Sequence, residues 1–259
     1  MKNLSTSLFF SLIFVLSCSN DDEAVMMEPT GPDPRCENVD CASGGTCVDG
    51  ICACDPGYVG ERCETYVPVQ LRLQSETPIE IIDGGISIDS LYGKLYAGGI
   101  IFYIDMGGYL PGKEGLVCSP NFLPRSYGWG CLETDLDNVP NVAQYPNRPF
   151  SNEAGAKIGD GLANTQAISA RTCASQSAAT ACTDASINGF DDWFLPAAGT
   201  LDLMYKNLEV AGLVDFNNQT LWSSTERAGS GAWRTSFSGG AHAVTNKQSN
   251  LSVRPVRTF

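Results

Sequence analysis

The spacing of apolar residues predicts several strands in the C-terminal part of the chain. Four runs are rich in β-branched and aromatic residues, as strands usually are: residues 99–104, 115–118, 232–237 and 252–257. In the third run, Trp233, Thr235 and Phe237 occupy alternate positions, and Arg234 and Ser236 lie between them. Because successive side chains of a strand point to opposite faces, the pattern predicts one buried and one exposed face.

Helical periodicity is weaker and confined to two short segments. One helix is predicted over 164–172 and another over 196–208, where Leu201, Met204 and Leu208 recur on one face. Strands at both ends of this region with helices between them favour a mixed α+β fold whose terminal strands meet.

The N-terminal apolar run has the features of an export signal. Residues 8–16 are mostly apolar and follow Lys2, but the run is too short for a transmembrane helix, so 1–17 is predicted to be a signal peptide. The next motif, Val15-Leu16-Ser17-Cys18, resembles a bacterial lipobox, which implies an acylated Cys18 at the mature N-terminus. The alternative is an ordinary cleaved signal in which this cysteine is incidental.

Residues 18–35 are expected to be a lipidated, flexible tether. They contain Pro29, Gly31, Pro32 and Pro34 and few apolar side chains, so they cannot bury a core. The acidic run at 19–23 resembles the surface-export signal of some Gram-negative lipoproteins. These resemblances imply a lipid-anchored protein at the surface of a bacterial outer membrane, attached to the membrane through Cys18.

Composition and charge narrow the classes of function. The chain has 259 residues, 16 Lys and Arg against 29 Asp and Glu, a net charge of -13 and 43% hydrophobic residues. This composition can form a core, so extensive disorder is not expected. Nucleic acid is excluded as a partner because phosphate binding needs clustered cations. His242 is the only histidine in the sequence, so a Ser-His or Cys-His catalytic pair would depend on it alone.

The cysteine count predicts disulfides. The sequence has 11 cysteines, an odd number that acylation of Cys18 reduces to ten. Six of them, from Cys36 to Cys63, follow the spacing Cys-x4-Cys-x5-Cys-x4-Cys-x-Cys-x8-Cys. So short a segment cannot fold on a hydrophobic core alone, and export favours disulfides over metal ligation. Spacing by itself leaves the pairing open.

With Gly57, Tyr58 and Gly60 in the last interval, this segment resembles an EGF-like domain over 36–65. The resemblance implies three disulfides: Cys36 with Cys47, Cys41 with Cys52, and Cys54 with Cys63. The sequence before the first cysteine lacks the acidic pair of calcium-binding members, so no metal site is expected. The module is either a protein-binding unit or a rigid spacer.

Four cysteines remain in the larger C-terminal region. Cys118 and Cys131 lie close in sequence, as do Cys173 and Cys182. In an oxidising compartment each pair is expected to form a disulfide. The alternative is a catalytic thiol, which would need His242 as its base.

Motifs along residues 66–259 resemble the Lcl C-terminal domain family, found in exported bacterial proteins. They are the segments 96–103, 115–117, 128–131, 158–165 and 201–205, with GFDDWFLP at 189–196, WSSTE at 222–226 and VRPVR at 253–257. The resemblance implies a fold akin to C-type-lectin and formylglycine-generating-enzyme domains and a role in binding or adhesion. Glycosaminoglycan binding is attributed to the bacterial collagen-like adhesin after which the family is named. Here 13 basic and 18 acidic residues follow Tyr66, so the overall field does not favour sulfated polyanions.

The segment 227–250 is the predicted recognition surface, because it gathers hydrogen-bonding side chains in loop-like sequence. Its candidate ligand-binding residues are Arg234, Ser236, His242, Asn246 and Lys247. The alternative is a solvated hairpin without a special role. Trp193 and Trp222 are interpreted as core residues rather than sugar-stacking platforms. No sequence feature predicts a metal ion, a nucleotide or another cofactor.

Taken together, the sequence predicts a non-enzymatic binding or adhesion protein that recognises an extracellular glycan or protein ligand. One alternative is a structural or assembly component of the cell surface without a ligand of its own. The other is an enzyme of the formylglycine-generating type, which would need an unpaired Cys173 or Cys182.

Overall fold

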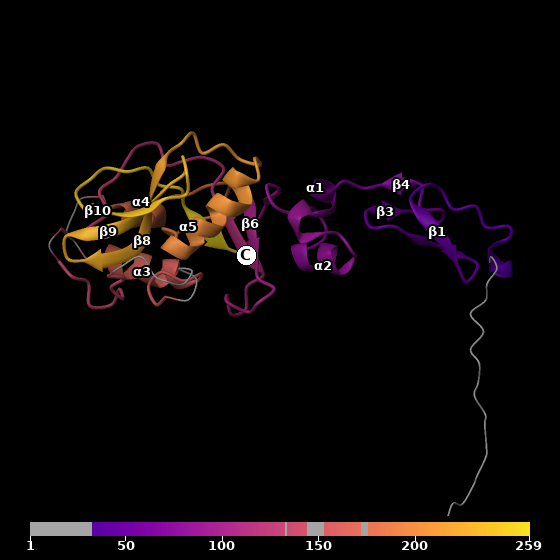
Figure 1. The fold of residues 1–259 in the computed structure, drawn as a ribbon, viewed down its shortest axis with the longest axis horizontal. Coiled ribbons are helices and arrows are strands. Elements are labelled where there is room, and N and C mark those ends of the chain that lie inside the picture. Colours follow the sequence, from indigo (N-terminus) through magenta and orange to yellow (C-terminus); the bar gives the residue numbers. More distant parts are fainter. Residues whose placement is uncertain (1–32, 133, 144–152, 172–175) are drawn as a thin grey trace, which may run out of the picture.

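The computed structural model describes residues 33–132, 134–143, 153–171 and 176–259. The predicted signal peptide, most of the tether, Cys18 and Cys173 lie outside these residues. Figure 1 shows a small module at one end, two short helices next to it, and a larger mixed domain at the other end.

The small module is held by short strand pairs and disulfides. Strands β1 (Gly45–Val48) and β2 (Ile51–Cys54) form a hairpin whose turn residues, Asp49 and Gly50, have φ values of 54° and 85°, the sign that a two-residue hairpin turn requires. A short 3-10 turn, η1 (Pro34–Cys36), precedes them. Strands β3 (Tyr58–Val59) and β4 (Thr65–Tyr66) pair at the other end, so the module extends through Tyr66.

The disulfide pairing expected for this module is confirmed. The bonds join Cys36 to Cys47, Cys41 to Cys52, and Cys54 to Cys63. They replace a core that these few residues cannot build.

Three short helical segments connect the module to the larger domain. They are α1 (Val69–Arg72), α2 (Pro78–Asp83) and the 3-10 turn η2 (Ile88–Ser90). Thr77 and Glu80 form a reciprocal capping box at the start of α2, which satisfies two amides that the helix cannot. Ile81 is fully buried in a cluster that includes Trp193 of the larger domain. These helices therefore belong to the core of the larger domain.

A four-stranded antiparallel sheet has the order β11-β7-β6-β5. The strands are β5 (Leu95–Tyr96), β6 (Gly99–Ile104), β7 (Gly115–Cys118) and β11 (Val256–Thr258). Early and late strands thus share one sheet, which confirms the expectation that the terminal strands meet. The last strand begins only after Pro255, which has no amide hydrogen to donate to a sheet.

A second, three-stranded sheet has the order β10-β9-β8. Its strands are β8 (Thr220–Ala228), β9 (Gly231–Ser236) and β10 (His242–Asn246). Along β9 and into the following turn, Trp233, Thr235 and Phe237 are buried, while Arg234 and Ser236 are partly exposed. The alternation predicted from the sequence is confirmed.

Helices cover these sheets. They are α3 (Asp160–Ser169), α4 (Ala178–Thr183) and α5 (Ala198–Met204), which continues as the π-helical segment η4 (Tyr205–Val210). Helix α3 starts four residues before the predicted helix. The helix predicted over 196–208 is confirmed in position, although the chain changes from α to π geometry after Met204. No helix of the described residues is long and apolar enough to cross a bilayer.

All four tryptophans pack in the interior with their indole N–H satisfied. Trp129, Trp193, Trp222 and Trp233 are each no more than 5% exposed. Each donates to a backbone carbonyl oxygen, at 2.7 to 3.0 Å. The interpretation of Trp193 and Trp222 as core residues is therefore confirmed, and neither presents a face on which a sugar could stack.

The predicted disulfides of the larger domain are wrong. Cys118 and Cys182 are free thiols, both buried, whereas Cys131 is disulfide-bonded. Cys118 lies in β7 and packs with Phe102 and Val256, while Cys131 packs in a different apolar cluster with Trp129. The prediction relied on closeness in sequence. In the fold, β7 places the Cys118 sulfur in one apolar cluster, whereas Cys131 lies in another.

Candidate functional site

The predicted recognition residues do not form one surface. Strands β9 and β10 pair so that His242 lies opposite Thr235 and Ala243 lies opposite Arg234. Directly opposite residues of an antiparallel pair share a face. Arg234 and His242 therefore lie on opposite faces of the sheet.

Three of the five predicted residues make local contacts within β9, β10 and the turns that follow these strands. Arg234 Nε donates to Thr245 Oγ1 at 2.8 Å, and the hydroxyls of Ser236 and Ser238 are 2.9 Å apart. Asn246 Oδ1 accepts a hydrogen bond from the amide of Gln248 at 2.8 Å. These contacts stabilise the strands and the turn that follows them.

Lys247 is a buried structural residue rather than a surface contact. Its side chain and that of Glu226 are both 0% exposed and form an ion pair. Lys247 Nζ also donates to Thr134 O at 2.9 Å and lies 4.6 Å from the centre of the Trp129 ring. The sequence suggested exposure because lysine is rarely buried, and burial here depends on the carboxylate partner supplied by β8.

His242 links β10 to α5. Its Nδ1 lies 2.9 Å from Thr235 Oγ1, and its Nε2 lies 3.5 Å from Asp202 Oδ1. The order Thr-His-Asp is that of a catalytic triad, but Thr235 is 0% exposed, so no substrate reaches its hydroxyl. Burial raises the pKa of Asp202, yet hydrogen bonds from His242 and Lys206 outweigh it and hold that pKa below its usual value. The group therefore serves to hold the two elements together.

The free thiols lack the properties of catalytic nucleophiles. Cys182 is completely buried in α4, and desolvation strongly raises the pKa of its thiol. Burial likewise raises the pKa of Cys118, although the nearby Arg254 guanidinium opposes this shift. A reactive cysteine needs partial exposure and a lowered pKa, and neither sulfur has them.

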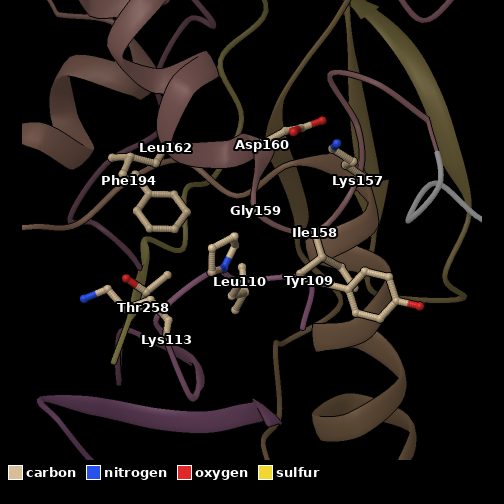
Figure 2. Close-up of a pocket in the computed structure, with 11 residues that line it drawn as sticks. Tyr109, Leu110, Lys113, Lys157, Ile158, Gly159, Asp160, Leu162, Phe194 and Thr258 are labelled. Atoms are coloured by element: carbon tan, nitrogen blue, oxygen red, sulfur yellow. The ribbon is translucent and has the colours of Figure 1, made fainter. Parts of the chain in front are cut away.

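A pocket on the larger domain offers a better candidate site. It has a volume of about 440 Å³ and is lined by the loop between β6 and β7, the start of α3 with the residues before it, Phe194 and Thr258. We call it the Lys113–Lys157 pocket after the two cations in its lining. Figure 2 shows Lys157 and Asp160 on one side and Lys113 and Thr258 on the other, with Phe194, Leu110 and Ile158 between them. Its volume lies within the usual range of small-ligand sites.

Asp105 organises the loop wall of the pocket. This residue follows β6 and its carboxylate accepts hydrogen bonds from the amides of Gly107, Tyr109 and Leu110 and from the Tyr103 hydroxyl. Burial alone would raise the pKa of Asp105, but the amide hydrogen bonds from Leu110 and Tyr109 hold it below its usual value. The carboxylate thus fixes the loop so that Leu110 is buried and Tyr109 is exposed.

The start of α3 forms the opposite wall. Gly159, at the N-cap of the helix, has a φ of 94°, a conformation that favours glycine. A β-carbon at this position would lie 3.3 Å from Leu110 Cδ2. Another at Gly161 would lie 2.9 Å from the Phe194 ring. The two glycines therefore allow the helix to approach the loop and the aromatic floor closely.

The pocket combines apolar walls with two exposed lysines. Lys113 and Lys157 are exposed, and among the described residues neither forms an ion pair. Asp160 also lies in the lining, and its carboxylate accepts a hydrogen bond from the Gly155 amide at 2.7 Å. Burial raises the pKa of Asp160, although that hydrogen bond and Lys157 oppose the shift. The site therefore suits a ligand with an apolar body and negative charge.

Other parts of the described chain offer weaker candidates for a binding site. A second hollow of about 580 Å³ lies beside Leu95, Phe122 and Ile187, and its lining contains no charged side chain. Nowhere in the described ranges do three or more His, Cys, Asp or Glu side chains cluster as metal ligands would.

Comparisons with known proteins agree on the small module. Residues 36–66 match the Teneurin-like EGF domain family, and with the three disulfides this shows an EGF-like domain. The chain is 36% identical to mouse (Mus musculus) Fibulin-7 over 75 residues, which are 25% of this chain and 15% of that protein. The match thus covers a small part of the relative.

Among solved structures, the larger part of the chain matches a fimbrial protein from Bacteroides ovatus ATCC 8483. The TM-score is 0.43 and the sequence identity 16%, over 62% of this chain and 44% of the other.

The Lys113–Lys157 pocket could not be predicted from the sequence. The lining residues come from segments far apart in sequence, and only the fold brings them together. One signal was available: the loop after Asp105 contains Gly107, Gly108 and Gly112 and also Tyr109, an aromatic residue in a glycine-rich connection between strands. Exposed aromatic residues on fixed loops are typical of recognition sites.

Proposed function

We propose that this chain is a non-enzymatic binding protein displayed outside the cytoplasm, whose larger domain binds a ligand in the Lys113–Lys157 pocket. The EGF-like domain supports the location, because disulfide-stapled modules persist in oxidising compartments. In this proposal the module holds the binding domain away from the membrane. The observation that carries the binding role is the pocket itself, with its apolar walls and two lysines that form no ion pair within the described part of the chain.

Attachment to a bacterial outer membrane through acylated Cys18 belongs to the same proposal. It rests on the export-like sequence of 1–17 and the lipobox-like motif at 15–18. Kinship of the larger domain with C-type-lectin and Lcl C-terminal domains is likewise proposed from the motifs and from the mixed sheet-and-helix architecture.

A binding role is preferred to catalysis because the candidate groups for chemistry are inaccessible. The thiols of Cys118 and Cys182 are buried, and Thr235, the hydroxyl next to His242, is 0% exposed. Nucleophilic catalysis requires a group that the substrate can reach.

The test uses the secreted chain, residues 19–259, with its disulfides intact. It is screened against a displayed random-peptide library and a glycan array, and the retained binders are titrated with two variants. Leu162→Glu places a charge in the pocket wall, while Ala163→Glu places the same charge on the next exposed position of α3, outside the lining. Both positions lie near a helix N-terminus, where glutamate is tolerated.

We expect binders whose affinity falls about ten-fold or more with Leu162→Glu and stays within about two-fold with Ala163→Glu, since a charge in an apolar contact costs more than 1.4 kcal/mol. Binders that respond equally to both variants would show that the pocket is not the site. A chain that retains no binder in either screen would favour the structural or assembly role instead.

A further inference from the structure

The lining of the Lys113–Lys157 pocket is a poor match for a polyhydroxylated ligand. Its floor and walls are formed by Leu110, Pro111, Ile158, Leu162 and Phe194. A sugar needs many hydrogen-bonding partners for its hydroxyl groups, and burying a hydroxyl without a partner is costly. The interior of this pocket is suited to an apolar side chain.

Charge is placed at both ends of this apolar interior. Lys157 lies on one side of the pocket and Lys113 on the other, as Figure 2 shows. The nearest acid in the lining, Asp160, is turned to the Gly155 amide. A ligand that fills the interior and carries a carboxylate on each side of its apolar group can therefore reach both ammonium groups.

The rim extends the contact area beyond the pocket. Two apolar side chains of the lining are themselves exposed: Tyr109 at 56% and Leu162 at 43%. Tyrosine is enriched at the centre of protein interfaces. Exposed apolar groups around a pocket favour an occupant larger than the pocket, so a polypeptide fits better than a small organic acid.

We propose that the ligand is an acidic peptide segment in which a large apolar side chain, seated in the pocket, lies between two carboxylates that contact Lys113 and Lys157. This proposal rests on the proposed function and specifies its ligand. The partner is thus a protein with an exposed acidic segment interrupted by an aromatic or large aliphatic residue.

The test compares designed peptides by isothermal titration calorimetry with the secreted chain. The reference peptide is acetylated and amidated and has phenylalanine between two aspartates. In one analogue asparagine replaces both aspartates, and in another serine replaces phenylalanine. A fourth probe, 3-phenylpropionate, carries one carboxylate on a short chain attached to a phenyl group and has no peptide backbone.

We expect the asparagine analogue to bind about five-fold more weakly, as loss of two exposed ion pairs implies. The serine analogue should bind about ten-fold more weakly because it leaves the apolar interior empty. Lys113→Gln and Lys157→Gln should each remove most of the preference for aspartate over asparagine. Lys94→Gln, a lysine outside the lining, should leave it unchanged, and 3-phenylpropionate should bind more weakly than the reference peptide.

Equal binding of the aspartate and asparagine peptides would overturn this proposal, as would equal binding of 3-phenylpropionate and the peptide. Either result would leave the proposed function standing if Leu162→Glu still weakens the binders selected by screening. If no designed peptide binds while a screened glycan does so through the pocket, the ligand class is wrong and the site is right.

Discussion

At the scale of single residues, a few polar side chains fix the loops and strands that surround the site. The Asp105 carboxylate accepts hydrogen bonds from three backbone amides and one hydroxyl. Glu226 and Lys247 form an ion pair inside the core and also bind the backbone at Leu136 and Thr134. In each case one side chain satisfies backbone groups of a segment outside the helices and strands, so the cost of removing it should exceed that of an average surface contact.

Replacing Asp105 by alanine should destabilise the protein by about 1 to 3 kcal/mol at neutral pH, because several amides lose their acceptor. Urea unfolding measures this loss, and hydrogen exchange should accelerate in the loop at 106–112. Asp89→Ala, which removes an exposed carboxylate from η2, is the matched control. If the loop keeps its protection in Asp105→Ala, the carboxylate does not organise it.

The destabilisation caused by Asp105→Ala should depend on pH. The folded-state pKa of Asp105 is below its usual value, so the stabilisation is fully present above the unfolded pKa of about 4 and is lost as the pH falls through the lower folded value. The difference in unfolding free energy between the wild type and Asp105→Ala should therefore shrink in acid. A difference that stays constant down to about pH 2 would contradict this assignment.

Removal of one partner of the buried ion pair should be costly. Lys247→Ala leaves Glu226 buried without its cation and should destabilise the protein by about 3 to 5 kcal/mol. A double variant, Lys247→Met with Glu226→Gln, should recover part of this loss because it removes both charges. A double-mutant cycle of Lys247→Met, Glu226→Gln and the double variant, measured by urea unfolding, gives the coupling free energy. Additive effects would mean that the two side chains act independently.

At the scale of secondary-structure elements, the sequence predicts features that depend on spacing within one short segment. It misses features that depend on which other element packs against a residue. The alternation along β9 and the small disulfide-stapled module were predictable because each reflects spacing along a short segment. The burial of Lys247 and the free state of Cys118 were not, because each depends on which other element packs against the residue. Strand β7 points Cys118 toward Phe102, away from the cluster that holds Cys131.

The cysteine assignment in β7 and α4 can be checked directly. Iodoacetamide should not label Cys118 or Cys182 in the native protein, since both thiols are buried. Both should be labelled after unfolding in denaturant without reductant, whereas Cys131 should remain unlabelled. Peptide mass spectrometry identifies the modified residues. A disulfide-linked peptide that joins Cys118 to Cys131 would contradict the structure.

At the scale of the whole molecule, an EGF-like domain and a mixed α+β domain are joined by short helices. Strand β4 leads through Val67, whose amide donates to Gly57 O at 2.8 Å, into α1. Gly85, after α2, approaches Pro56 of the module so closely that a β-carbon there would lie 3.0 Å from the proline ring. Such contacts limit bending at the junction, as the proposed spacing role of the module requires.

The pocket is also a property of the whole domain. Its walls come from the loop after β6, the start of α3, Phe194 and Thr258, and no local pattern relates these segments. The sequence directed attention to 227–250 because polar residues gather there in one continuous stretch. The structure divides that stretch between two sheet faces and the core, and places a concave surface elsewhere.

The most direct test of the account is to map where a ligand contacts the folded chain. Titration of the isotope-labelled protein with the peptide that has phenylalanine between two aspartates should shift backbone amide resonances at 109–113 and 157–162, while those at 231–246 remain unchanged. Shifts confined to 231–246, or shifts at neither segment when a screened binder is used in place of the peptide, would contradict the assignment of the Lys113–Lys157 pocket as the binding site.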